Sequence, residues 1–187
     1  MTPSIDAPRR RLLSTWLRSC WSRDSEWLKE FIDREAWVVV PVESGLHFDS
    51  GDAERLSRAA RLAGCKQLFA VTLEEDLCAE ESPEREGSLR GVYAVEPTPA
   101  DLAEFSRVLG SFNYILVAED FSFAVACITE EYYLIAGPPA VVEAGLEGSI
   151  GDAQGTFLAF ARDSNADEWT RRVHMKVADR YCSAVEG

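Results

Sequence analysis

The sequence lacks the local patterns that identify common enzymes and metal sites. Its 187 residues contain no Gly-x-Gly-x-x-Gly after a strand-like run, no Walker A loop, no Gly-x-Ser-x-Gly and no His-Glu-x-x-His. The two histidines, His47 and His174, are far apart in the sequence, and nothing around them marks a catalytic pair. We therefore expect a protein without enzymatic activity, metal or cofactor.

Cysteine is present but forms no recognisable framework. Cys20, Cys65, Cys78, Cys127 and Cys182 are odd in number, widely separated and never spaced as Cys-x-x-Cys. This pattern favours reduced thiols in a cytoplasmic protein, several of them small buried hydrophobes. Long apolar runs are missing as well. No run reaches the roughly 18 residues that a membrane span requires, and polar residues interrupt the N-terminal stretch, so we expect neither a span nor a signal peptide.

Positive charge is scarce in the middle of the chain. The formal net charge is −13, and residues 36–169 hold 24 Asp/Glu against eight Lys/Arg, whereas both ends are mildly basic. Such a body repels nucleic acid phosphates and anionic membranes and attracts a basic protein. The same charge also serves solubility alone, so composition leaves both explanations open.

The most apolar stretch, Ser111–Gly137, predicts three strands joined by short polar turns. The strand-like runs cover 114–118, 121–128 and 132–136, and β-branched and aromatic residues dominate each of them. Gaps of two and three residues are hairpin lengths, so we expect an antiparallel meander. The middle run is apolar on both parities, which predicts a strand covered on both faces.

The rest of the chain alternates between strand and helix patterns. Further strands are expected at 37–42, 67–73 and 89–95, and the strand–helix–strand order within 37–73 is compatible with a parallel crossover. Helical periodicity covers 9–32 as two helices or one kinked helix, then 51–63, 99–109, 140–146, 149–161 and a segment from 165. The clearest helix start is Thr98–Asp101, with a capping hydroxyl, a proline and a first-turn acid.

These patterns predict one α+β domain over residues 1–187. Its sheet is expected to be mixed but mostly antiparallel, with about six strands, the C-terminal meander and flanking helices. Residues 1–8 are expected to be disordered. The helix within residues 165–187 carries an apolar stripe at Trp169, Val173, Val177 and Tyr181 on a polar segment. It is expected to fray, or to lie peripherally against a partner or the N-terminal helix.

The acidic segment Glu74–Glu86 is the strongest candidate for a binding surface, together with the first turn of the meander. The carboxylates assigned to partner binding are Glu74, Glu75, Asp76, Glu80, Glu81, Glu84, Glu86, Glu119 and Asp120. Clustered acids accelerate and orient association with a cationic protein. Acid-rich loops are also often no more than solvated linkers.

Residues Phe112–Pro139, FNYILVAEDFSFAVACITEEYYLIAGPP, and the short helices after them resemble small cytoplasmic bacterial immunity proteins, which neutralise secreted toxins. The resemblance covers residues 98–161 and rests on the hydrophobic pattern and the Tyr-Tyr-Leu-Ile-Ala-Gly-Pro ending. It implies a binder that blocks a toxin by surface occlusion, and it carries over no functional residue. The acidity of the chain agrees, since nuclease toxins tend to be basic.

The sequence leaves three interpretations open. The expected one is a non-enzymatic protein that occludes a basic toxin or another cationic protein, with no nucleic acid or membrane partner. The second is a small enzyme with an unmarked carboxylate-based site. The third is an adaptor or homodimer that uses the Trp-rich N-terminal helix or the C-terminal stripe. A flat acidic face would favour the binding protein, and a deep polar pocket would favour the enzyme. A large apolar patch would favour the adaptor or homodimer.

Overall fold

A six-stranded antiparallel sheet forms the centre of the protein. The computed structural model describes residues 7–22, 30–31, 36–72, 92–109, 112–129, 131–163, 165 and 167–182. The sheet has the strand order β3-β8-β7-β6-β4-β5. Its strands are β3 (Val38–Glu43), β4 (Leu68–Thr72), β5 (Val92–Val95), β6 (Tyr114–Ala118), β7 (Ala124–Ile128) and β8 (Tyr132–Gly137). A second, two-stranded sheet joins β1 (Trp21–Ser22) to β2 (Glu30–Phe31).

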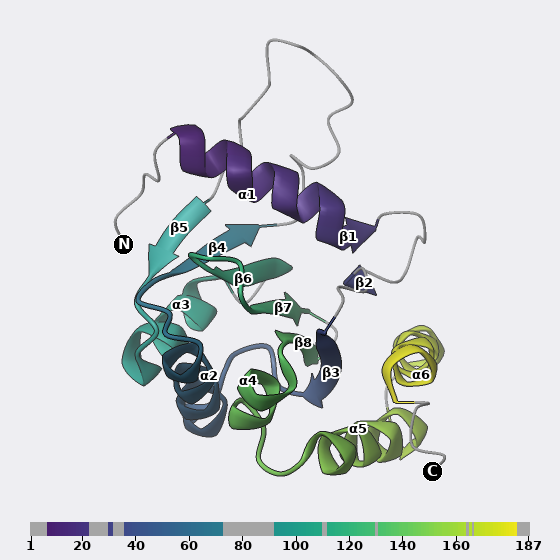
Figure 1. The fold of residues 1–187 in the computed structure, drawn as a ribbon. Coiled ribbons are helices and arrows are strands. Elements are labelled where there is room, and N and C mark those ends of the chain that lie inside the picture. Colours follow the sequence, from purple (N-terminus) through teal and green to yellow (C-terminus); the bar gives the residue numbers. More distant parts are fainter. Residues whose placement is uncertain are drawn as a thin grey trace.

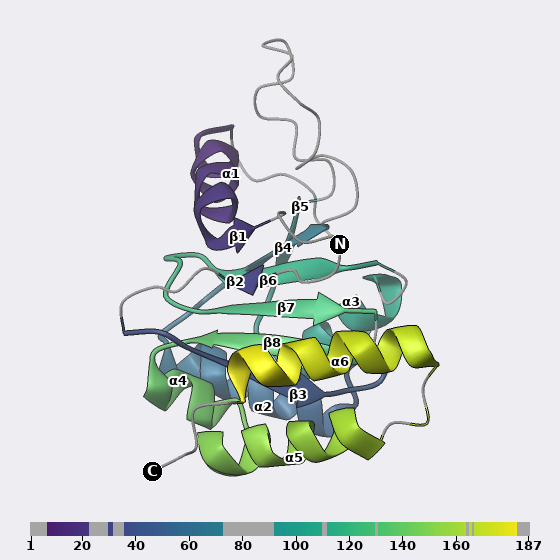
Figure 2. The same cartoon turned by 90° about the vertical axis from the view of Figure 1, so that its right-hand side faces the viewer.

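Helices cover the sheet on both faces (Figures 1 and 2). The helices are α1 (Ala7–Cys20), α2 (Ser50–Leu62), α3 (Pro99–Leu109), α4 (Pro139–Ala144), α5 (Ile150–Asp163) and α6 (Glu168–Tyr181). One apolar core joins one face of the sheet to α2, α3 and α4, and the other joins the opposite face to α1, α5 and α6. None of the helices in the described part of the chain is long and apolar enough to cross a membrane.

The meander lies where its composition places it, in the middle of the sheet. Every residue of β6, β7 and β8 is buried, as expected for strands that are apolar on both parities. The middle strand is shorter than predicted because Phe121 adopts a positive φ of 59° in the turn after β6. The α+β class, a sheet of six strands and the meander are therefore confirmed.

The sheet is antiparallel throughout, whereas a mixed sheet was expected. β3 and β4 run in the same direction, but β8, β7 and β6 lie between them. α2 therefore connects the two halves of the sheet and not two neighbouring parallel strands. The meander explains this arrangement, since its outer strands β8 and β6 take β3 and β4 as their antiparallel partners.

The N-terminal region differs from the predicted pair of helices. α1 forms as expected and buries Leu13, Trp16 and Leu17 against the sheet. The prediction of helix up to Ile32 is wrong, because Glu30 and Phe31 pair as a strand with Ser22 and Trp21. The predicted disorder of residues 1–8 falls mostly on residues outside the described ranges.

The helix starts follow the capping signals in the sequence. Asp49 caps α2 and forms a capping box with Asp52, and Thr98 accepts a hydrogen bond from the Asp101 backbone N–H at 3.2 Å. At the C-terminal end, α6 packs with α5 on the sheet. Its stripe residues Val173, Val177 and Tyr181 are buried, whereas Trp169 is exposed. Most of the C-terminal stripe is thus part of the core.

The glycine after α4 tests how tightly that core is packed. A Cβ at Gly145 would collide with Ile135 of β8, although its φ of −87° suits any residue. We expect Gly145→Ala to lower the free energy of unfolding by about 1–3 kcal/mol through overpacking. Gly155→Ala in α5 is the matched control, because a Cβ there meets no atom within 4 Å. It should stabilise the helix by about 0.5–1 kcal/mol.

Urea unfolding measures the free energy of unfolding of both variants and of the wild-type protein. Equal and small changes for the two substitutions would show that Ile135 can shift freely and that the contact between α4 and β8 is loose.

Candidate functional site

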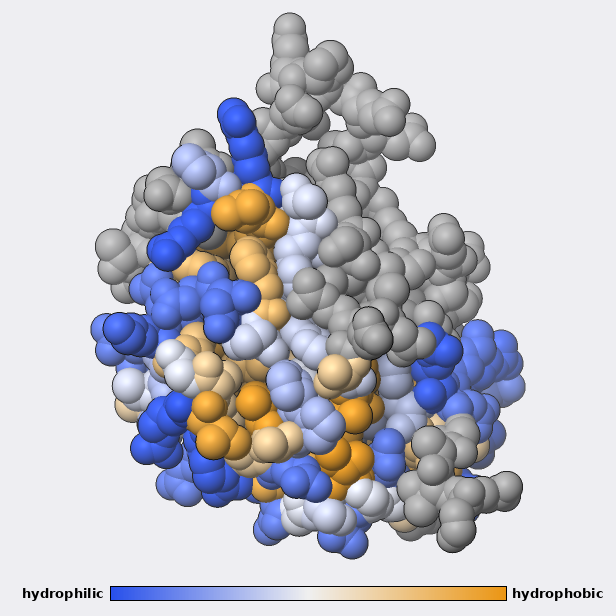
Figure 3. Space-filling model, viewed as in Figure 1, coloured by the Kyte–Doolittle hydropathy of each residue, from blue (hydrophilic) through white to orange (hydrophobic). Residues whose placement is uncertain are grey.

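An open groove lies between the edge strand β5 and helix α3. Residues of both elements line it: Ala94, Val95, Glu96, Asp101, Glu104, Phe105 and Val108. Its volume is about 240 Å³. We call this feature the acidic groove. Hydrophilic residues cover the side of the molecule that carries α2 and α3, while apolar residues show in the middle of the same view (Figure 3).

Helical periodicity brings the α3 side of the groove together. Asp101, Glu104, Phe105 and Val108 are spaced by three or four residues, so they share one face of α3. Phe105 is buried and forms the floor, whereas the side chain of Val108 is 52% exposed. Glu96 completes the groove because it directly follows the last residue of β5. The result is an apolar floor with three carboxylates around it.

The three groove carboxylates are exposed and have no cationic partner among the described residues. Ion pairs elsewhere in the described part of the chain join Arg55 to Asp52 and Glu147, and Arg172 to Glu168. Asp101 accepts a hydrogen bond from the Thr98 hydroxyl at the start of α3. The groove is therefore a concentration of negative charge that faces solvent.

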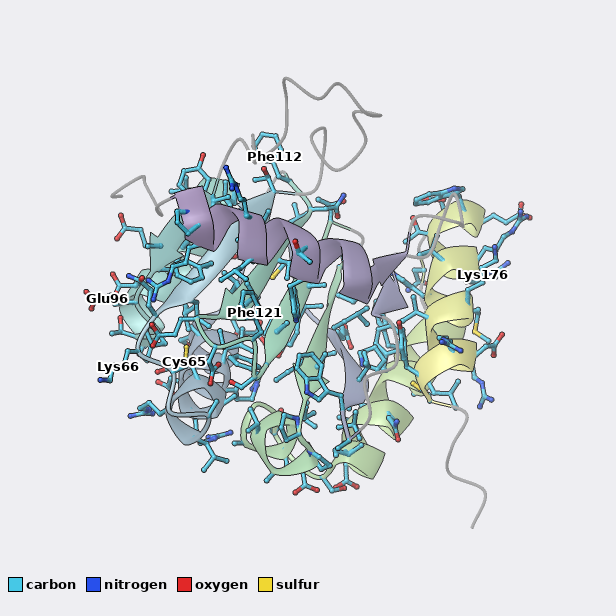
Figure 4. The ribbon with its side chains drawn as sticks, turned by 45° about the horizontal axis from the view of Figure 1, so that its top comes forward. Cys65, Lys66, Glu96, Phe112, Phe121 and Lys176 are labelled. Atoms are coloured by element: carbon cyan, nitrogen blue, oxygen red, sulfur yellow. The ribbon has the colours of Figure 1, made fainter. Side chains whose placement is uncertain are left out.

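The turn between β6 and β7 lies at the same end of the sheet as Glu96. Leu68 of β4 pairs with Val95 on one side and with Ala118 on the other, so the residues after these two strands are close in space. Figure 4 shows Glu96 with Lys66 and Cys65 at this end, and Phe112 at the far end of the strands. The β6–β7 turn and Lys66 thus lie at the same end of the sheet as Glu96.

Glu119 and Asp120, assigned to partner binding from the sequence, both accept backbone hydrogen bonds within the fold. The Glu119 carboxylate accepts a hydrogen bond from the Lys66 backbone N–H at 3.2 Å. The Asp120 carboxylate accepts one from the Ser122 backbone N–H at 3.0 Å. Neither residue lines the acidic groove, and their role in binding stays a prediction. The other assigned carboxylates, Glu74, Glu75, Asp76, Glu80, Glu81, Glu84 and Glu86, lie outside the described residues.

Sequence reasoning missed Glu96 and Glu104 and treated Asp101 only as a helix-start acid. Available signals were the spacing of Asp101, Glu104 and Val108 on one helical face and an acid at the end of a strand. Their meaning depends on β5 lying beside α3, which no local pattern specifies.

A second polar cluster is buried beneath the loop that joins β3 to α2. The Asp52 carboxylate accepts hydrogen bonds from Arg55 at 2.7 Å, Ser44 at 3.0 Å and Tyr133 at 3.3 Å. Burial raises the pKa of Tyr133, and the Asp52 carboxylate raises it further. The cluster ties β3, α2 and β8 together and keeps the Tyr133 hydroxyl protonated.

A small cavity of about 10 Å³ adjoins this cluster and has room for roughly one water molecule. Cys127 and Tyr114 line it on neighbouring strands, where they are paired in the sheet register. Burial raises the pKa of both groups well above their ordinary values. A thiol held in its neutral form is a poor nucleophile. Neither Cys127 nor Tyr114 is therefore an activated nucleophile in this cavity.

Both histidines make contacts within the fold. His47 Nδ1 lies 3.2 Å from the Ser106 backbone carbonyl oxygen. His174 is fully buried and packs against the rings of Tyr132, Phe157 and Phe160. Within the described ranges, no group of three or more His, Cys, Asp or Glu side chains is arranged to hold a metal ion.

Comparisons with protein-family models, curated proteins and solved structures find no match for this chain. The site is therefore interpreted from its own residues.

Removing the buried carboxylate should destabilise the protein strongly. Asp52→Ala deletes the acceptor for Arg55, Ser44 and Tyr133, and the Arg55 side chain is only 21% exposed. We expect the free energy of unfolding to fall by about 2–3 kcal/mol. Tyr133→Phe removes one hydrogen bond and should cost about 1 kcal/mol.

Glu168→Ala serves as the control, since its ion pair with Arg172 is solvent-exposed and should contribute at most about 0.5 kcal/mol. Denaturant titrations measure the free energy of unfolding of all three variants. A loss for Asp52→Ala no larger than that for Glu168→Ala would mean that the cluster does not stabilise the fold.

The buried thiols should resist modification in the folded protein. Cys65, Cys127 and Cys182 are buried, and burial raises the pKa of Cys182 to about 11. In a background with Cys20→Ser and Cys78→Ser, a disulfide reagent at pH 8 should label none of the three until denaturant is added. Rapid labelling of the native protein would show that one of these thiols is accessible and ionised.

Proposed function

We propose that this chain is a non-enzymatic binding protein whose acidic surface binds a cationic protein. The most concrete form is an immunity-type inhibitor, in a bacterial cytoplasm, that neutralises a basic toxin by covering its surface. The observation that carries the proposal is the acidic groove, where Glu96, Asp101 and Glu104 surround an apolar floor without a cationic partner among the described residues. The resemblance of residues 98–161 to immunity proteins stays a prediction.

Electrostatics supports this kind of partner. The chain carries a net charge of −13, and three carboxylates in one groove focus the negative potential there. Exposed like charges repel one another, and a cationic surface relieves that repulsion when it binds. The partly exposed Val108 adds an apolar contact inside the charged rim, which is the anatomy of a specific interface.

The two alternative functions receive less support from the described residues. The nucleophile candidates near the small cavity are buried with raised pKa values, and the acidic groove is open to solvent. For an adaptor or homodimer, the C-terminal stripe is largely occupied, since Val173, Val177 and Tyr181 are buried against the sheet. A binding surface at the groove therefore explains more of the molecule than either alternative.

The test compares two charge-reversed variants of equal net charge. The first carries Glu96→Lys and Glu104→Lys in the groove. The second carries Glu43→Lys and Glu143→Lys, at exposed positions on β3 and α4. Asp101 is left unchanged because it belongs to the cap of α3. A partner is first captured from the native host with the wild-type protein and then purified for kinetic measurements.

We expect a basic partner whose association rate falls steeply with added salt. The rate should drop at least about tenfold for the groove variant and no more than about twofold for the control. An association rate that ignores ionic strength, or equal effects of the two variants, would contradict an acidic docking surface at the groove. Circular dichroism of both variants shows that they remain folded.

A further inference from the structure

The two edges of the six-stranded sheet differ in how they are protected. β3 contains Pro41, which has no N–H group to donate, and α5 packs beside this strand. β5, with the sequence Val-Tyr-Ala-Val, contains neither a proline nor a charged residue. Among the described residues, β4 is the one strand that pairs with it. An uncharged edge without these devices is suited to pairing with another chain.

The acidic groove runs along this same edge. β5 contributes Ala94 and Val95, Glu96 directly follows the strand, and α3 contributes the face that carries Asp101, Glu104, Phe105 and Val108. The ring centroids of Tyr93 and Phe105 are 5.9 Å apart, so α3 packs directly beside the edge strand. A strand paired with β5 would therefore lie over the groove, with alternate side chains directed toward α3.

We propose that an extended cationic segment of the partner pairs with the open edge of β5 as a seventh strand and fills the acidic groove. The inference rests on the proposed binding function and specifies the binding mode. β5 spans four residues, which offers an edge about 13 Å long. From Asp101 to Val108 the axis of α3 rises about 10 Å, so the groove and the strand edge match in length.

The charges specify the side chains of this segment. Alternate residues of a strand point to the same face, so lysine or arginine at every second position would line up along α3. Their aliphatic stems would cover Val108 while their cationic groups approach Asp101, Glu104 and Glu96. Backbone hydrogen bonds would supply affinity, and the carboxylates would select the cationic sequence.

A second copy of this chain is a poorer occupant of the same edge. Pairing two β5 strands would bring the two sets of groove carboxylates toward each other, and like charges in close contact disfavour association. The groove thus selects against self-association while it favours a cationic strand.

The test uses the intact protein and the peptide acetyl-Lys-Val-Lys-Val-Lys-Val-Lys-amide in three forms. One is unmodified, one is N-methylated at its valines and one at its internal lysines. All three have the same charge, but in a paired strand the N–H groups of one set face β5 and those of the other face solvent. N-methylation on the paired side therefore blocks the ladder and leaves electrostatic attraction intact.

We expect the unmodified peptide to bind, one N-methylated form to bind at least about tenfold more weakly, and the other to bind within about twofold of the parent. In NMR spectra the amides of Tyr93, Ala94 and Val95 should shift on binding, whereas those of β3 should not. The Glu96→Lys/Glu104→Lys variant should lose binding of all three forms, and the Glu43→Lys/Glu143→Lys control should keep it.

Equal binding of the three peptides would overturn strand pairing and leave the acidic binding function standing, because charge alone would then account for the interaction. Absence of binding by the unmodified peptide, or concentration-dependent dimerisation whose NMR shifts map to β5, would also overturn the inference. Failure of the binding function itself would appear separately, as a natural partner that the groove variant binds as fast as the wild-type protein does.

Discussion

Burial of the central strands on both faces is the constraint on which the rest of the structure depends. Tyr132 and Tyr133 are consecutive in β8 and therefore point to opposite faces, yet both are buried. Tyr132 packs against Phe157 and His174, whereas Tyr133 packs against Phe48 and reaches Asp52. A sheet of this kind is stable in water only when helices cover both faces, and it gives each amphipathic helix of the chain a place to pack.

The central position of the meander also decides which strands become edges. With β6, β7 and β8 in the middle, β3 and β5 are left at the two sides. α5 packs against β3, and α3 packs against β5, which among the described residues pairs only with β4. The exposed part of α3 then meets the end of β5, where Glu96 joins Asp101 and Glu104. The acidic groove is thus a consequence of sheet order as much as of the acids themselves.

Local signals predicted the local structure well. Hydrophobic runs located β6 and β8 almost to the residue, and the Thr98–Asp101 pattern marked the start of α3. The failures concern long-range choices. Periodicity at 27–32 suggested a helix, but pairing with β1, the two residues directly after α1, made Glu30–Phe31 a strand. The contact between Asp52 and Tyr133 joins residues 81 positions apart, and the groove depends on β5 meeting α3. Neither follows from spacing along the chain.

Among the described residues, Asp52 and the groove carboxylates differ in what surrounds them. Asp52 is buried, and Arg55, Ser44 and Tyr133 compensate its charge, so it contributes to the specificity of the fold. The groove carboxylates Glu96 and Glu104 are exposed and form no ion pair with a described residue, and their like charges repel each other. Under the proposed function, this repulsion leaves a cationic partner more free energy to gain on binding, whereas the Asp52 cluster belongs to the fold alone.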